Sequence, residues 1–324
     1  MPTPAGFGLG YRVHVSIRRM ASVAWRAATH AGAGVPWSRA CYNKRAMSHR
    51  HKLLPALLLL LVALAGCAID NSVLQADQTD PSVSPSPGSE PRSSDSGWQR
   101  VHTAMELRTL RLAAGATVGE ATIVRFDPAA YRVSVKYDVR NPGTVREWYE
   151  ALRPLAVING GYFDTSGRAT ALVVFDGIRR GTSYEGFGGM VAINERGEFE
   201  LRSLSQQPYD ENEPLQQAMQ SAPMLIQPGG ELAAIQDDDV DRSRRSVIAR
   251  DRSGRILLLV SRSPVFTLRE LAQALHRSDL EIDAALNLDG GRSTGLYLQT
   301  ETANVAIDSF ERVPLVLVVE ERTS

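Results

Sequence analysis

The stretch that most constrains the fold is residues 286–298, which read LNLDGGRSTGLYL. Two apolar runs flank a short polar segment that contains Asp289, Gly290 and Gly291. Because glycine accepts positive φ and allows close approach to the backbone, this pattern predicts a strand, a tight turn and a second strand. The N–H groups of such a turn suit an anion, so Asp289 is a candidate site residue as well as an ordinary turn residue.

Helical spacing of apolar residues is restricted to short segments. It predicts helices over 144–152, 214–220 and 267–276. The last of these has the strongest signal, because Thr267 and Glu270 form a capping box and the apolar residues that follow lie on one face. Pro154 is expected to end the first helix.

Most of the remaining sequence predicts strands. Alternating or short apolar runs lie at 121–126, 131–139, 155–158, 171–175, 190–194, 224–226, 246–250, 255–261 and 314–319. Turn residues predict one hairpin around Asp127-Pro128 and another around residues 251–254. Strands and helices interleave without a regular βαβ rhythm. We therefore expect an α+β fold, with a single mixed sheet, several hairpins and a few helices.

The first third of the chain has the pattern of an exported protein. We interpret residues 1–46 as an untranslated or unstructured extension and Met47 as the start of a signal peptide over 47–66. A basic segment precedes the apolar run 53–64, which is shorter than a comfortable membrane span and ends in small residues. An ordinary membrane anchor is the alternative interpretation.

The residues LAGC at 64–67 resemble a bacterial lipobox. The resemblance implies that Cys67 is acylated and anchors the mature protein to a membrane, at the periplasmic face of the outer membrane if the cell is Gram-negative, because Ala68 follows. Residues 67–97 are rich in Ser and Pro and predict a flexible tether. The folded domain is expected over 98–324.

Composition excludes several classes of function. The 36 basic and 36 acidic residues give a formal net charge of zero, so no global field favours nucleic acid. Cys41 and Cys67 are the two cysteines, which excludes a disulfide framework and a cysteine zinc site. The aspartates at 237–239 and 241 lack the ligand spacing of an EF-hand. No cofactor is predicted, and a metal requirement is left open.

Four motifs occur in a defined order along the chain. They are NGGYFD from Asn159, SAPMLI from Ser221, RRSVIA from Arg244 and NLDGGRS from Asn287. Together they resemble the phosphodiester glycosidase family over residues 101–320. Two residues depart from the pattern of that family: Arg292 replaces a third glycine, and Ala249 replaces the glycine that ends the third motif.

This resemblance implies hydrolysis of a sugar phosphodiester, for example a GlcNAc-1-phosphodiester, to a free sugar and a phosphomonoester. Such cleavage passes through an oxocarbenium-like state and usually needs two carboxylates. Asp289 is the candidate nucleophile or base. A phosphate leaving group needs less protonation than an alcohol does, so cationic stabilisation by Arg245 is the expected counterpart.

The other candidate residues would hold the substrate. Asn159, which is grouped with Asp289 and Arg245 as a catalytic candidate, and Ser221 and Ser293 would contact sugar hydroxyls or phosphate oxygens. Two glycine pairs, Gly160-Gly161 and Gly290-Gly291, would form an anion nest. Each also has a plain interpretation, as a turn residue or, for Arg245, as an exposed strand end. For the second carboxylate the sequence leaves three candidates open: Asp164, Asp176 and Glu185.

Two other functions remain as alternatives. One is a phosphodiesterase that cuts the P–O bond. The other is an envelope lipoprotein that binds glycan or phosphate in the same pocket without catalysis.

Overall fold

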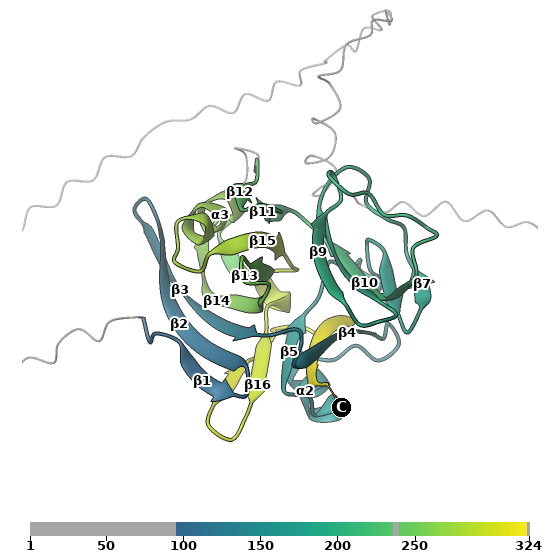
Figure 1. Ribbon diagram of the computed structural model, residues 1–324, viewed down its shortest axis with the longest axis horizontal. Coiled ribbons are helices and arrows are strands. Elements are labelled where there is room, and N and C mark those ends of the chain that lie inside the picture. Colours follow the sequence, from purple (N-terminus) through teal and green to yellow (C-terminus); the bar gives the residue numbers. More distant parts are fainter. Residues whose placement is uncertain (1–94, 236–239, 323–324) are drawn as a thin grey trace, which may run out of the picture. The chain divides into compact units, whose positions relative to one another are not determined.

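The computed structural model describes residues 95–235 and 240–322 (Figure 1). The extension 1–46, the signal peptide 47–66, Cys67 and most of the tether lie outside the described residues. So do aspartates 237–239. The predictions for these segments therefore stay predictions. In the described part of the chain, no helix is long and apolar enough to cross a membrane.

The described chain is mostly β-sheet, arranged as three sheets. Every strand pairing within the described residues is antiparallel. We expected an α+β fold with one mixed sheet; the prediction of a single mixed sheet is wrong, because the described residues form three antiparallel sheets. Hairpins and sharp returns join neighbouring strands, and no βαβ crossover is present in this part of the chain to make a parallel pair.

The largest sheet has eight strands in the order β1-β2-β3-β14-β13-β15-β11-β12. Their bounds are β1 (Gln99–His102), β2 (Met105–Ala114), β3 (Thr117–Phe126), β11 (Met224–Gln227), β12 (Glu231–Leu232), β13 (Ser243–Asp251), β14 (Ile256–Phe266) and β15 (Ile282–Asn287).

The two smaller sheets have five strands each, in the orders β7-β6-β10-β8-β9 and β17-β16-β5-β18-β4. The first contains β6 (Val173–Phe175), β7 (Ile178–Arg180), β8 (Gly189–Asn194), β9 (Phe199–Ser203) and β10 (Leu215–Ser221). The second contains β4 (Tyr131–Tyr137), β5 (Ala156–Asn159), β16 (Leu296–Gln299), β17 (Asn304–Ile307) and β18 (Leu315–Glu321).

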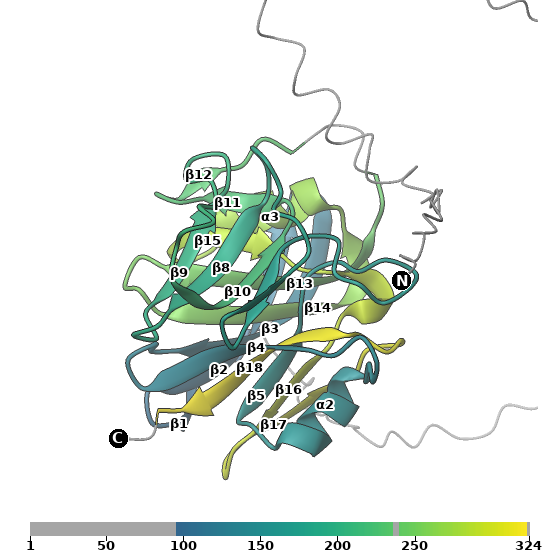
Figure 2. The ribbon, with the colours of Figure 1, turned by 90° about the vertical axis from the view of Figure 1, so that its right-hand side faces the viewer.

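Two α-helices cover sheet faces in the described chain. Helix α2 (Val145–Leu152) lies against β5 and β16, as Figure 2 shows, and α3 (Leu268–His276) packs on the eight-stranded sheet. Both begin with a capping box, in which Thr144 pairs with Glu147 and Thr267 pairs with Glu270. The two predicted helices over 144–152 and 267–276 are confirmed.

Two local predictions are wrong. Residues 214–220 form strand β10 instead of a helix, because pairing with β6 and β8 overrides the helical preference of its residues. Strands β3 and β4 do not form a hairpin, since β3 pairs with β2 and β14 whereas β4 pairs with β18. The segment 286–298 forms the predicted strand, turn and strand, although β15 and β16 belong to different sheets and do not pair as a hairpin; the 3₁₀ turn η1 (Gly291–Ser293) lies between them.

The main hydrophobic core lies where the three sheets meet. Each sheet contributes fully buried side chains to it, such as Leu286 from β15, Ile158 from β5 and Met219 from β10. A second core fills the space between the eight-stranded sheet and α3, where Leu271 and Leu275 are buried. The end of β5 and the end of β15 therefore emerge from one common core.

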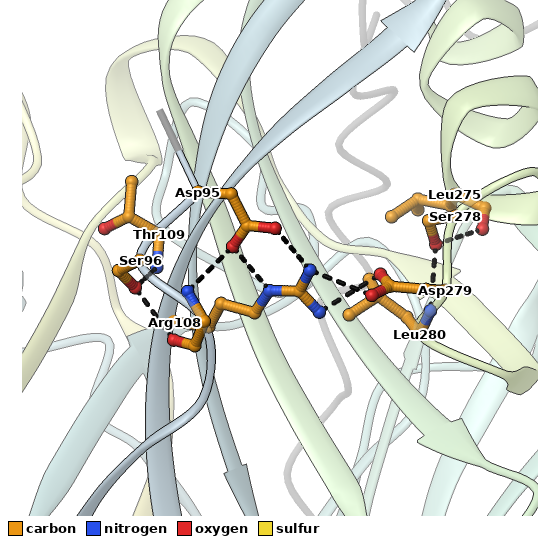
Figure 3. Close-up of polar contacts among 9 residues, drawn as sticks. Asp95, Ser96, Arg108, Thr109, Leu275, Ser278, Asp279 and Leu280 are labelled. Atoms are coloured by element: carbon orange, nitrogen blue, oxygen red, sulfur yellow. Dashed lines mark hydrogen bonds and ion pairs between the residues drawn. The ribbon is translucent and has the colours of Figure 1, made fainter. Parts of the chain in front are cut away.

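The described chain begins with a charged anchor, three residues before the predicted domain boundary. Arg108 on β2 makes bidentate contacts with Asp95 and Asp279 (Figure 3), with its Nη2 atom 2.6 Å from Asp95 Oδ2 and 2.9 Å from Asp279 Oδ2. The Trp98 ring covers Arg125, whose guanidinium carbon lies 3.6 Å from the ring centroid. These contacts fix the entry of the chain onto the eight-stranded sheet.

Candidate functional site

The turn that carries Asp289 is held between two sheets by its backbone. Leu288 N donates to Ser246 O at 2.9 Å, and Asp289 N donates to Gly160 O at 3.0 Å. The first bond ties the turn to β13 of the large sheet, and the second ties it to the segment that leaves β5. Asp289 is therefore positioned by the meeting of sheets and not by a hairpin of its own.

Asn159, the last residue of β5, is fully buried and links three segments through its side chain. Its amide nitrogen donates to Asp289 O at 2.6 Å. Its amide oxygen accepts from Ser246 Oγ at 2.7 Å and from Gly295 N at 3.1 Å. These contacts position the Asp289 turn, and they leave little of the amide for the substrate contact that the sequence predicted.

The carboxyl group of Asp289 has an unusual proton affinity. Burial raises its pKa to about 6, and the negative charge of Glu311 adds to the rise. Hydrogen bonds from Ser293 and from the Gly290 amide work in the opposite direction and are too weak to restore the ordinary value. A carboxyl group that titrates near neutral pH suits general acid or base work.

Glu311, in the segment between β17 and β18, is the carboxylate that the structure places beside Asp289. Ser293 Oγ donates to Glu311 Oε1 at 2.8 Å and also contacts the carboxyl group of Asp289. A hydroxyl carries one hydrogen, so Ser293 cannot donate to both carboxylates at once. While Ser293 donates to Glu311, a protonated Asp289 can donate to the serine oxygen.

The three carboxylates left open by the sequence have other contacts. Asp164 closes its own turn by accepting hydrogen bonds from Ser166 and the Arg168 amide, and these bonds lower its pKa despite partial burial. Asp176 accepts from Gln217 Nε2 at 2.9 Å, and Glu185 is exposed. No contact recorded for the described residues joins any of them to Asp289. Sequence reasoning missed Glu311, which follows Ser293 by 18 residues and reaches it only through the return of β17 and β18.

Arg245, the predicted phosphate clamp, is buried and holds main-chain carbonyls. Its Nε atom donates to Phe266 O at 3.1 Å, and its Nη2 atom donates to Asp241 O at 2.5 Å. Its alkyl chain lies close to the turn, since a Cβ atom on Gly290 would be 4.0 Å from Arg245 Cδ. The residue is near the site, but its contacts brace β13 against the end of β14.

The two glycine pairs differ in whether their backbone amides are already engaged in hydrogen bonds. Gly160 N donates to Leu315 O at 2.9 Å, and Gly161 N contacts Met219 Sδ at 3.1 Å, so both amides are engaged. A Cβ atom on Gly161 would lie 2.5 Å from Gln220 O, which explains the need for glycine there by close packing. In the other pair, Gly291 has φ +62° and the Gly290 amide bonds the carboxyl group of Asp289.

Several buried polar atoms around the turn have no hydrogen-bond partner among the described residues. Ser221 Oγ, Asn287 Oδ1 and Thr294 Oγ1 are of this kind. Asn287 uses its other amide atom, which donates to Tyr162 Oη at 2.7 Å, and burial followed by the charge of Asp289 raises the pKa of Tyr162. Orphaned polar atoms are rare in folded proteins, and two of these three belong to the residues that end β10 and β15.

The described residues contain no group of three or more His, Cys, Asp and Glu side chains placed to hold a metal ion. The arrangement assembled by the fold is instead a pair of carboxyl groups that share one hydroxyl, with arginines on the adjacent strand. Such a pair can exchange a proton and stabilise developing positive charge on a sugar carbon.

Comparison with known proteins identifies relatives. The sequence profile of a family described as phosphodiester glycosidase matches residues 153–320. A hypothetical protein from Synechocystis shares the fold with a TM-score of 0.54 and 16% identity, over 68% of this chain and 62% of that one. The chain thus spans less than two thirds of the Synechocystis protein. No curated protein sequence matches the chain.

A second solved structure is similar over more of its own length. The catalytic domain of zebrafish N-acetylglucosamine-1-phosphodiester alpha-N-acetylglucosaminidase, auto-inhibited by its pro-peptide, has a TM-score of 0.54 and 18% identity. The similarity covers 70% of this chain and 87% of that domain. At such identities, the structural likeness shows a common fold.

Proposed function

Because the chain belongs to the phosphodiester glycosidase family, we propose that it hydrolyses the glycosidic bond of a sugar phosphodiester such as a GlcNAc-1-phosphodiester. The products are the free sugar and a phosphomonoester. The observation that carries this proposal is the Asp289 carboxyl group, with its pKa raised to about 6 and its link to Glu311 through Ser293.

In this reaction Asp289 acts at the anomeric carbon, as nucleophile or as base for water. It is ionised above pH about 6, and its negative charge stabilises the oxocarbenium-like transition state. Glu311 is the second carboxylate; it orients Ser293 and raises the proton affinity of Asp289. The leaving phosphate needs little protonation, so a positive charge at its oxygens replaces the strong general acid that other glycosidases use.

The test is to follow which bond breaks. The full-length protein is incubated in ¹⁸O-labelled water with a GlcNAc-α-phosphodiester and, separately, with bis-p-nitrophenyl phosphate. A glycosidase places the label on the anomeric hydroxyl of the released sugar. Label in the phosphate would instead show P–O cleavage and would replace the proposal with a phosphodiesterase.

Two variants test whether the two carboxylates take part in the reaction. Asp289→Asn is expected to lower kcat at least a hundredfold, and Glu311→Gln about tenfold or more, because each loses a charge that faces the transition state. Asp210→Asn, in an exposed loop, is the matched control and should keep wild-type activity. Saturable glycan binding without turnover in the wild type would indicate a binding lipoprotein instead of an enzyme.

We also propose that the protein acts in the cell envelope, anchored through acylated Cys67. Support comes from the basic segment, the apolar run 53–64 and the LAGC residues that end it. Cys67→Ser should move the protein from the membrane fraction to the periplasm or medium and abolish incorporation of labelled palmitate. Ser72→Ala, in the predicted tether, is the control, and unchanged membrane association of Cys67→Ser would contradict the anchor.

A further inference from the structure

Arg244 on β13 is a buried arginine whose donors are only partly used. It is 7% exposed, and its Nη2 atom donates to Asp308 O at 3.0 Å. The other donors, Nε and Nη1, are buried and have no hydrogen-bond partner among residues 95–235 and 240–322. A guanidinium group left with two unpaired buried donors is costly, because water no longer satisfies them.

No neighbouring carboxylate is paired with the positive charge of Arg244 among the described residues. The carboxylate of Asp308 is directed to helix α2, where Oδ1 accepts from Arg146 N at 2.9 Å and Oδ2 lies 3.6 Å from Arg146 Nε. Exposed Arg262 on β14 adds a second positive charge, which together with the larger effect of burial lowers the pKa of Arg244. A buried cation that lacks a paired carboxylate and has a like charge nearby favours binding of an anion.

The ring of Phe310 covers this guanidinium group. The Arg244 guanidinium carbon lies 4.1 Å from the ring centroid, while Phe310 itself is 64% exposed. The backbone of Phe310 is fixed to the Asp289 turn, because Phe310 N donates to Arg292 O at 2.7 Å. The exposed side chain of Phe310 can rotate off the guanidinium face while its backbone stays bound, and exposed side chains change rotamer rapidly.

Arg244 is also close to the carboxylate pair. A Cβ atom on Gly290 would lie 2.9 Å from Arg244 O, and Glu311 follows Phe310 directly in the chain. The guanidinium group itself contacts Asp308 O and the Phe310 ring, so it lies against the segment that carries Glu311 and bonds the Asp289 turn through Phe310 N and Arg292 O. This juxtaposition suits a substrate that presents a sugar carbon to the carboxylates and a phosphate to the arginine.

We propose that Arg244, supported by Arg262, binds the phosphate group of the substrate, and that the Phe310 ring covers this subsite and moves aside when phosphate enters. The phosphate then accepts from Nε and Nη1, the two donors that the protein leaves unpaired. That the bound phosphate belongs to the substrate rests on the proposed function. That Arg244 binds phosphate does not depend on it. It differs from the sequence prediction, which gave the phosphate to Arg245.

Direct titration with inorganic phosphate tests the subsite without relying on catalysis. Isothermal titration of the full-length protein should show that Arg244→Gln weakens phosphate binding about tenfold or more, and that Arg244→Lys recovers part of it. The exposed Arg111→Gln, on β2, is the matched control and should bind as the wild type does. Unchanged binding by a folded Arg244→Gln protein, or loss in Arg245→Gln alone, would overturn the proposal.

Two exposed positions keep the test valid if Arg244→Gln does not fold. Arg262→Gln should weaken phosphate binding about threefold, because it removes the supporting charge. Phe310→Ala should tighten it about threefold, because the ring no longer has to leave the guanidinium group before phosphate enters. Wild-type affinity in both variants would overturn the covered subsite.

The outcomes also separate this proposal from the proposed function. If the wild type binds phosphate through Arg244 but releases no sugar from any phosphodiester, the glycosidase proposal fails and the anion subsite stands. If sugar is released and Arg244→Gln changes neither KM nor phosphate affinity, the subsite fails and the glycosidase proposal stands.

Discussion

At the scale of single residues, Asn159, predicted to contact substrate, has structural contacts in the fold. Its buried amide joins Asp289, Ser246 and Gly295. Asn159→Ala removes these bonds and leaves their partners buried, so we expect the free energy of unfolding to fall by about 2–4 kcal/mol. Urea denaturation measures this change.

The control for Asn159 is Asn304→Ala, an exposed position on β17, which should change stability by less than about 0.5 kcal/mol. If Asn159→Ala kept wild-type stability and lost only activity, the amide would be a substrate ligand, as the sequence predicted.

Asp289 is expected to make the folded protein less stable at neutral pH. Its folded-state pKa, about 6, exceeds the ordinary value of 3.8, so the folded state holds the proton more tightly. Stability therefore falls as pH rises through this window, and the loss is complete above pH 6. Asp289→Asn should stabilise the protein by about 1–2 kcal/mol at pH 7.5, a figure discounted for partial exposure.

Thermal unfolding at several pH values measures this effect. The gain from Asp289→Asn should shrink as pH falls from about 6 through 3.8 and disappear well below 3.8, where Asp289 is protonated in both states. A gain that is independent of pH would show that burial of the charge is not its cause. In the wild type, an ionised Asp289 in the reaction predicts that kcat/KM rises with pH through about 6.

The sequence pointed to Asp289 as a candidate site residue but not to the residues around it. The turn glycines and the order of motifs pointed to this residue, because a turn motif is formed by residues that are adjacent in the sequence. Glu311 carries no local signal, and Arg244 stands in a recognised motif in which the sequence singled out Arg245 instead. The first becomes a neighbour through the return of β17 and β18, and the second is distinguished from Arg245 only by which donors the fold leaves unpaired.

At the scale of secondary-structure elements, Glu270 fixes helix α3 to the large sheet. Burial alone would raise its pKa, but hydrogen bonds from Arg242, Thr267 and Thr117 hold the pKa at about 2. This stabilisation is present above pH 4.5, the ordinary pKa, and is lost as pH falls toward 2. Glu270→Gln should cost about 1–2 kcal/mol at pH 7 and progressively less below pH 4.

Acid titration of stability distinguishes this role from simple helix propensity. Glu195→Gln, in an exposed turn, is the control and should follow the wild type at every pH. A cost of Glu270→Gln that persisted unchanged at pH 2 would contradict the charge-assisted contacts as its source.

The elements that were predicted correctly have their determinants in neighbouring residues. The capping box of α3 and the turn between β13 and β14 are complete within a few positions. Strand β10 was mistaken for a helix because its strand state depends on β6 and β8. The assignment of β15 and β16 to different sheets likewise depends on distant partners, so alternation within 286–298 could not reveal it.

At the scale of the whole described domain, the site and the fold share the same contacts. Asp289 follows a strand of the large sheet, Asn159 ends a strand of one small sheet, and Ser221 ends a strand of the other. The site therefore exists only when all three sheets are packed together. Any change that separates two of the sheets should reduce stability and activity together.

Gly161→Ala tests this coupling, because Gly161 lies where the exit of β5 meets the end of β10. An added Cβ atom would lie 2.5 Å from Gln220 O, and a backbone atom cannot move aside as a flexible side chain does. The backbone of Gly161 is outside the left-handed region, so the penalty is steric and not conformational.

For Gly161→Ala we expect a loss of about 2–4 kcal/mol in unfolding free energy and at least a tenfold loss of kcat/KM. Gly143→Ala is the matched control, since its nearest neighbour would be Glu147 Cβ at 3.3 Å, a contact that a shift of a few tenths of an ångström relieves. If Gly161→Ala lost stability but kept full kcat/KM, the small sheet containing β10 would be a support for the fold without a part in the site.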